Sequence, residues 1–295
     1  TIEVLGFGSF VEDCHYITHG IGHAQLRRHE GNVGKSFAAM SEDAYFKNLS
    51  TCGNGYFHGV IEEYTKDIKS TDALTAALTL VCREPGAKNQ IDCFHGMGHA
   101  AFIQLEYNTK DALAVCDAVS NDPVMQYSCY MGTFMEMSQD FSPEDLVTVK
   151  DGRMTFTTCD AQEARYRVAC YAQHAAFFEN FTKTPDDFAK NITFCTQIEH
   201  DEYRMACVKF FAGRAIRVMK YEDVPAMCQD GTSNRDERIA CTAVFAGRIA
   251  RSLDGTKSTP LYHQALSDVC RTLSFLDSGR CIALVKDPAN KLYFN

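Results

Sequence analysis

The chain carries CVKFFAGRAIRVM at residues 207–219 and CTAVFAGRIARSL at residues 241–253, which are two copies of one segment. Both copies begin with a cysteine and have Phe-Ala-Gly-Arg at the same offset from it. Other segments that start on a cysteine align with these two, at residues 14, 52, 93, 129 and 170. The period is about 38 residues, which is typical of helical hairpins stacked into an array.

A second kind of segment ends on a cysteine and completes each hairpin. Four of these segments open with Asp or Glu, the residues that a helix N-terminus prefers, at residues 72–82, 111–116, 186–195 and 222–228, and a fifth covers 261–270. The sequence therefore predicts an all-α fold, a disulfide-stapled, solenoid-like array of about seven αα-hairpins in a single domain over residues 1–295. The one β candidate is a short hairpin over 147–157, around Asp151-Gly152.

The cysteine spacing predicts the disulfide pairing. Joining each closing cysteine to the next opening one gives separations of 11 to 13 residues, whereas pairing within a hairpin gives a much looser set. A repeated loop geometry favours the uniform set, although sequence alone does not fix connectivity. The predicted bridges are Cys82–Cys93, Cys116–Cys129, Cys159–Cys170, Cys195–Cys207, Cys228–Cys241 and Cys270–Cys281, with Cys14–Cys52 as the remaining pair.

The composition indicates in which compartment the protein works and which classes of partner it is not expected to bind. Fourteen cysteines without a zinc-finger or haem-attachment spacing indicate disulfides, and therefore an oxidising compartment. We expect a secreted protein, extracellular or periplasmic, because the chain also starts at Thr1 as a processed protein would and carries glycosylation sequons at Asn48, Asn180 and Asn191. The net charge of −9 argues against a nucleic-acid partner. No apolar run is long enough to span a membrane.

The histidines, unlike the cysteines, are not spread evenly along the repeats. Seven of the ten lie in the predicted first helices, and six of these fall within residues 14–137, whereas residues 160–295 carry Arg instead. His15, His19 and His23 recur at every fourth position, so they lie along one helix face. His58 and His99 both stand six residues after their cysteine, where the next repeat has Met135. Neighbouring helix axes lie about 8–10 Å apart, so imidazoles from successive first helices can converge.

Carboxylates and glycines accompany these histidines. Glu62 and Glu63 follow His58 by one turn, and Glu136 follows Met135. Imidazole and carboxylate ligands, with the thiols consumed in disulfides, suit a transition metal, and we favour copper or iron over zinc. Glycine costs about 1 kcal/mol against Ala inside a helix, so pairs such as His58-Gly59 indicate close helix approach or room for a bound group.

Each residue type also has a plainer interpretation. Any single histidine is a satisfied core residue more often than a ligand, and His29, His200 and His263 are assigned to the surface or to structural roles. Phe and Met in the first helices are interpreted as core packing. An arginine stands three residues before the cysteine at Arg167, Arg204 and Arg238, and we expect these to pair with acidic groups on a neighbouring helix.

The order of four motifs, each of which begins at a cysteine, resembles that of a known family. It runs CHxxxHxxG from Cys14, CxxGYxHGxxE from Cys52, CxHGxGH from Cys93 and CYxGxFME from Cys129. This order resembles an uncharacterised family of secreted prokaryotic cysteine-rich proteins and transfers no chemistry. The architecture resembles the disulfide-stapled αα-repeats of the Helicobacter cysteine-rich proteins, which are relatives of tetratricopeptide arrays.

The sequence thus predicts a secreted metal-binding helical-repeat protein, with a His/Glu site between the first helices of units one to three and redox chemistry if the metal is copper or iron. Glu62, Glu63 or Glu136 would carry a proton beside the metal. The alternative is a structural or adhesive scaffold, or a subunit of a filament or array, that self-associates or takes an extracellular protein partner. Whether the protein is an enzyme stays open. The predicted metal ligands are His15, His19, His23, His58, His95, His99, His174 and Glu136.

Overall fold

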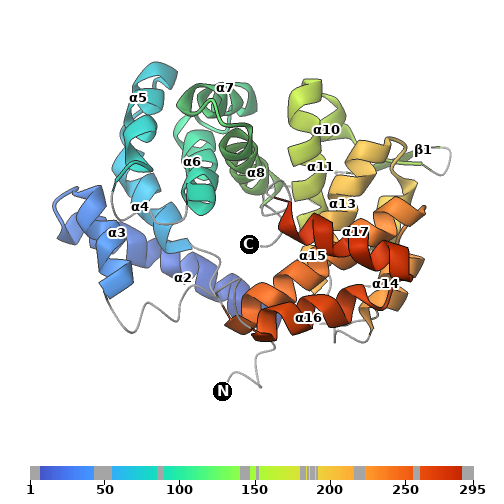
Figure 1. The fold of residues 1–295 in the computed structure, drawn as a ribbon. Coiled ribbons are helices and arrows are strands. Elements are labelled where there is room, and N and C mark those ends of the chain that lie inside the picture. The colour runs from blue at the N-terminus through green and yellow to red at the C-terminus, as the bar shows by residue number, and fades with distance from the viewer. Residues whose placement is uncertain are drawn as a thin grey trace. The chain divides into compact units, whose positions relative to one another are not determined.

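In the computed structural model, the chain forms helices that divide into two compact units, Thr1–Asp140 (unit 1) and Phe141–Asn295 (unit 2) (Figure 1). The structure describes residues 7–42, 55–84, 90–139, 147–150, 153–179, 192–215, 223–254 and 260–287, with the single positions 184, 186 and 190. The predicted all-α, disulfide-stapled fold is confirmed. The solenoid, the number of repeats and the single domain stay predictions.

In unit 1, the first helix of each helical hairpin packs on the first helix of the next hairpin. Helix α2 contacts α4, α4 contacts α6, and α6 contacts α8, while the second helices α5 and α7 contact each other (Figure 1). Ser70 and Asn108 cap α5 and α7 by accepting backbone N–H bonds with their side chains. The helices are α2 (Phe7–Arg28), α3 (Val33–Glu42), α4 (Gly55–Thr65), α5 (Thr71–Val81), α6 (Gln90–Gln104), α7 (Thr109–Val119) and α8 (Pro123–Gln139).

Unit 2 repeats this packing after a short hairpin. The predicted β-hairpin is confirmed as strands β1 (Val147–Lys150) and β2 (Arg153–Phe156), which pair antiparallel with Val147 opposite Phe156. Helix α11 contacts α13, α13 contacts α15, and α15 contacts α16 and α17. The helical segments are α10 (Thr157–Asp160), α11 (Ala164–Glu179), the 3-10 turn η2 (Thr193–Gln197), α13 (Asp201–Arg214), α14 (Val224–Asp230), α15 (Arg235–Asp254), α16 (Pro260–Cys270) and α17 (Phe275–Lys286).

The six disulfides that the structure describes are those predicted from spacing. They join Cys82–Cys93, Cys116–Cys129, Cys159–Cys170, Cys195–Cys207, Cys228–Cys241 and Cys270–Cys281. Each ties the end of a second helix to the next first helix and is expected to stabilise the fold by roughly 2–4 kcal/mol. The predicted Cys14–Cys52 bridge and the sequons at Asn48, Asn180 and Asn191 lie outside the described residues.

Six of the described first helices, α6, α8, α11, α13, α15 and α17, begin before their cysteines, and not on them as the segments predicted. Helix α6 starts at Gln90 and α13 at Asp201, and acidic residues in the first turns, such as Asp92 and Glu202, face the positive end of the helix dipole. The opening cysteine is therefore in the helix interior, buried against the preceding second helix. Of the predicted helix 186–195, the structure describes the turn η2 and only single positions before it.

The residue three positions before the cysteine caps the loop that the disulfide closes. Gln90 Nε2 donates to Cys82 O at 2.7 Å, Gln126 Nε2 to Ser120 O at 2.8 Å, and Arg167 Nη2 to Asp160 O at 2.9 Å. Arg238 donates to the side chain of Gln229. The predicted pairing of these arginines with acidic groups on a neighbouring helix is thus wrong for Arg167, which donates to loop carbonyls, and for Arg238, which donates to a side-chain amide.

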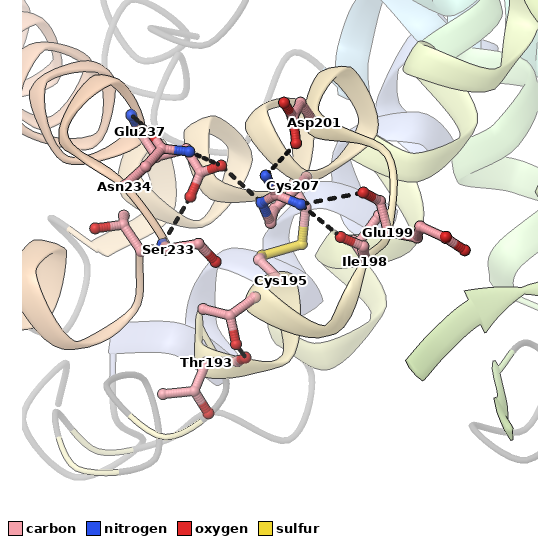
Figure 2. Close-up of polar contacts among 12 residues, drawn as sticks. Thr193, Cys195, Ile198, Glu199, Asp201, Cys207, Ser233, Asn234 and Glu237 are labelled. Atoms are coloured by element: carbon pink, nitrogen blue, oxygen red, sulfur yellow. Dashed lines mark hydrogen bonds and ion pairs between the residues drawn. A yellow bond between two sulfur atoms is a disulfide. The ribbon is translucent and has the colours of Figure 1, made fainter. Parts of the chain in front are cut away.

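Arg204 is the arginine for which that prediction is confirmed. Its Nε donates to Glu237 of α15 at 2.6 Å, and its Nη1 also donates to the carbonyl of Ile198 at 2.8 Å (Figure 2). Glu237 is 1% exposed, and its other oxygen accepts from Ser233 N at 2.7 Å. This buried carboxylate has its acceptors satisfied within the protein.

None of the helices within the described ranges combines the length and apolar character needed to cross a membrane.

Candidate metal centre

Five imidazoles from three successive first helices meet in the interior of unit 1. They are His15 and His19 of α2, His58 of α4, and His95 and His99 of α6. His58 is the central member, because its ring contacts the rings of all four others, with centroid separations of 4.7 to 5.4 Å. The predicted convergence of these five residues is what the structure shows. We call them the imidazole cluster.

Glycines let these helices approach closely enough for the rings to meet. A Cβ atom on Gly59 of α4 would lie 2.0 Å from the carbonyl oxygen of His19, so the two helices touch backbone to backbone there. A Cβ atom on Gly96 would lie 2.9 Å from the ring of His58, and one on Gly132 of α8 would lie 1.9 Å from His95 O. The glycines beside the histidines therefore serve close helix approach, one of the two explanations that the sequence offered.

The nitrogens of the cluster form two groups that share His58. His15, His19 and His58 each offer a ligand atom, and these atoms lie within 4.8 Å of one another; His58, His95 and His99 do the same. The Nε2 atoms of His15 and His19 are 3.1 Å apart. Two nitrogens bound at about 2.0–2.1 Å to one tetrahedral metal ion would be about 3.3 Å apart, so this spacing is that of neighbouring ligands.

Carboxylates hold two of the rings from outside. His99 Nδ1 donates to Glu136 Oε2 at 2.7 Å, and His19 Nδ1 donates to Glu62 Oε2 at 3.0 Å. In each ring this hydrogen bond places the proton on Nδ1, which leaves the Nε2 lone pair directed into the cluster. Such a carboxylate–histidine pair is the usual support of a metal-bound imidazole.

Glu136, predicted as a ligand, therefore lies where it orients His99, and Glu62, predicted as a proton carrier, lies where it orients His19. His23 reaches the cluster through Glu62, since its Nε2 lies 3.1 Å from the same Oε2. Burial would raise the pKa of the Glu62 carboxyl, but the hydrogen bonds from His19 and His23 outweigh burial and hold that pKa well below its usual range. Glu62 is thus a carboxylate. Its neighbour Glu63 pairs instead with Arg27 and Lys66.

Two ring nitrogens in the cluster lack a partner within the protein. His58 Nδ1 and His99 Nε2 are buried, and neither makes a hydrogen bond in the described structure. Burial, reinforced by the four neighbouring imidazoles, holds the pKa of His58 well below its ordinary value. His58 is therefore a neutral imidazole, which is the form that binds metal ions.

His174 has a separate environment in unit 2. Its Nε2 lies 2.8 Å from Thr158 Oγ1, and burial lowers its pKa to about 4. Cys159 and Cys170 lie beside it, but their sulfurs are joined in a disulfide and offer no thiolate. His200 and His263, assigned to the surface from the sequence, are exposed.

Met135 borders the imidazole cluster, although the sequence led us to interpret it as core packing. Its Sδ lies 3.4 Å from His95 Nε2, so it borders the cluster. The signal was present in the repeat, because Met135 has the same offset from its cysteine as His58 and His99.

Comparisons with protein-family models, with curated proteins and with solved structures found no significant match to this chain. The chemistry of the cluster is therefore argued from its own geometry.

Proposed function

We propose that the protein binds a transition metal through the imidazole cluster of unit 1. The observation that carries this proposal is the pair of buried, unpartnered nitrogens, His58 Nδ1 and His99 Nε2, one of which belongs to a ring held from its other side by Glu136. A metal ion is the partner that such nitrogens fit, since the neighbouring imidazoles present further lone pairs at ligand spacing.

Packing alone gives a poorer account of the cluster. Leaving a buried polar atom unsatisfied costs about 1–3 kcal/mol, and five imidazoles are gathered where apolar residues would fill the space without that cost. The close contacts of Gly55, Gly59 and Gly96, which draw α2, α4 and α6 together, are made with His15, His19 or His58. A bound ion would turn the unpaired nitrogens into ligands and add to the stability of the folded unit.

The donor set is compatible with copper or iron. Cysteine thiolates, which would favour a structural zinc site, are absent among the described residues because the cysteines are in disulfides. Imidazole suits Cu, Fe, Zn and Ni alike, and the disulfides fit the oxidising compartment of a secreted protein. Copper or iron would give the protein a redox-active ion.

Elemental analysis tests the proposal on protein purified without chelators or His-affinity steps. We expect about one to two equivalents of one transition metal in the wild type, as a cluster of this size can ligate. The variant His58→Ala/His99→Ala should lose it, whereas His200→Ala/His263→Ala, which removes two exposed histidines, should keep it. Glu136→Gln offers a milder substitution and should weaken metal binding by about 10–100-fold.

Circular dichroism and a disulfide count must show that each variant is folded. Wild-type protein that is folded, has its disulfides intact and binds no Cu, Fe or Zn even when these are added would contradict the proposal. The scaffold interpretation would then take its place.

A further inference from the structure

The fourth repeat, which opens at Cys129, places a thioether where the second and third repeats place an imidazole. Counted from the opening cysteine, Met135 of α8 is equivalent to His58 of α4 and His99 of α6. Its side chain is half-buried, and its sulfur lies 3.4 Å from His95 Nε2. The repeat and the geometry thus agree in placing Met135 on the border of the imidazole cluster.

Helix α8 is held against α6 by the same kind of contact that builds the rest of the cluster. A Cβ atom on Gly132 would lie 1.9 Å from His95 O, and one on Gly98 would lie 2.0 Å from Cys129 O. Gly132 is one turn before Met135, so the close approach brings the thioether onto the ring of His95. The next residue, Glu136, holds His99. One turn of α8 therefore supplies both a sulfur and the carboxylate that orients a neighbouring ring.

The distances on this side of the cluster are those between ligands of one ion. A sulfur at about 2.3 Å and a nitrogen at about 2.0 Å from a tetrahedral ion lie about 3.5 Å apart, close to the observed separation of Met135 Sδ and His95 Nε2. His99 contributes the buried, unpartnered Nε2 from the same helix face as His95, one turn later. Met135 therefore lies beside His95, which belongs with His58 and His99 to one group of nitrogens at ligand spacing.

On the basis of the function proposed above, we infer that Met135 is a metal ligand and that His95, His99 and Met135 form a copper(I) site. Thioether sulfur is a soft ligand that selects Cu(I), whereas zinc and iron gain little from it. The opposite side of the cluster, at His15 and His19, offers nitrogen alone. The two sides share His58, and we expect only the side that includes the thioether to favour Cu(I).

Met137 provides the matched control on the same helix. It is 5% exposed, and its sulfur accepts a contact from Thr109 Oγ1 at 3.5 Å, so its role is in packing between α7 and α8. Replacing either methionine by leucine keeps the volume of the side chain and removes the sulfur.

The experiment is an anaerobic titration of the full chain with Cu(I), in competition with a colorimetric Cu(I) chelator. Wild type and Met137→Leu should bind Cu(I) equally. Met135→Leu should lose at least about tenfold in Cu(I) affinity, equivalent to about 1.4 kcal/mol. Its affinity for Zn²⁺, measured in a parallel titration, should be unchanged, because the nitrogen ligands remain.

X-ray absorption at the copper edge gives a second measurement, which detects the ligand atoms directly. The wild type loaded with Cu(I) should show one sulfur scatterer in the first coordination shell, and Met135→Leu should show none. If Met135→Leu binds Cu(I) as tightly as the wild type, or if the wild type shows no sulfur scatterer, Met135 is not a ligand. The proposed metal-binding function would survive that result, whereas a wild type that takes up no metal at all would overturn both.

Discussion

The two units use the same helical packing but treat their buried polar groups in opposite ways. In unit 2, α13 and α15 meet through Arg204 and Glu237, and the buried carboxylate accepts from a guanidinium, a backbone N–H and the side chain of Asn234 (Figure 2). In unit 1, α4 and α6 meet through His58 and His99, and each leaves a buried nitrogen without a partner. Within the described residues, every buried side-chain nitrogen or oxygen atom that lacks a hydrogen bond belongs to unit 1.

On the function proposed above, this difference separates a structural site in unit 2 from a metal-binding site in unit 1. Arg204 and Glu237 complete each other, so unit 2 needs no ligand at this position. In the imidazole cluster, Glu62 and Glu136 orient rings from outside, whereas His58 Nδ1 and His99 Nε2 have no partner. The two sites stand at different repeat positions, since Arg204 lies three residues before its cysteine and His58 lies six residues after its own.

The largest expected effect comes from breaking the pair in unit 2. Arg204→Ala leaves the carboxylate of Glu237 buried and without its cation, and should lower the free energy of unfolding by about 3–5 kcal/mol. Denaturant unfolding measures the change. Arg280→Ala removes an exposed partner of Asp236 and should cost less than about 1 kcal/mol. Metal content should be unaffected in both variants, and a loss of metal in Arg204→Ala would undo the division between a structural and a binding site.

Forcing α6 and α8 apart should come next. Gly132→Ala places a Cβ atom against His95 O, so the helices must separate, and we expect a loss of about 1–3 kcal/mol in unfolding free energy together with weaker metal binding. Gly20→Ala is the control, because nothing lies within 4 Å of a Cβ atom there. It should stabilise the protein by up to about 1 kcal/mol. Equal behaviour of the two variants would contradict the close-approach argument.

The buried histidine of unit 2 predicts a pH dependence. The pKa of His174 is about 4 in the folded chain and about 6.5 when unfolded, so between these values the unfolded state binds one more proton. Stability should therefore fall as the pH drops from about 6.5 towards 4, by about 1.4 kcal/mol per pH unit from this residue. Unfolding of His174→Gln across this pH range should show that slope reduced, and an unchanged slope would mean that His174 is not the group responsible.

The smallest expected effect on stability comes from a tyrosine–aspartate hydrogen bond that both units have beside a disulfide. Tyr130 and Tyr171 directly follow their opening cysteines, and each donates to an aspartate that directly follows the closing cysteine, Asp117 or Asp160. Tyr→Phe at either position should cost about 0.5–1.5 kcal/mol, and similar amounts in the two units. Thermal unfolding with metal removed is the measurement, and a large difference between the variants would show that the units are stapled differently.

The sequence predicted the parts of this molecule that repetition determines. Uniform cysteine separations predicted the six described bridges because one loop geometry recurs, and the shared offset of His58 and His99 predicted their meeting because equivalent positions on packed helices face alike. His174 stands two residues earlier in its repeat, which is a rotation of about 200° around the helix, and this explains its separate environment.

Contacts that depend on a single side chain could not be predicted. Glu62 and Glu63 are neighbours in sequence, yet about 100° of helix rotation sends one to His19 and His23 and the other to Arg27 and Lys66. Likewise, the loop carbonyls that Arg167 caps become its neighbours only once the disulfide has closed the loop.

The most direct test is a crystal structure of the metal-loaded protein with diffraction data collected on both sides of the absorption edge of the metal. An ion bound by the imidazole cluster should give an anomalous peak within ligand distance of His58 and His99, with Glu136 still hydrogen-bonded to His99 on the far side of the ring. Well-ordered rings around water, with no anomalous peak although metal was supplied, would contradict the account.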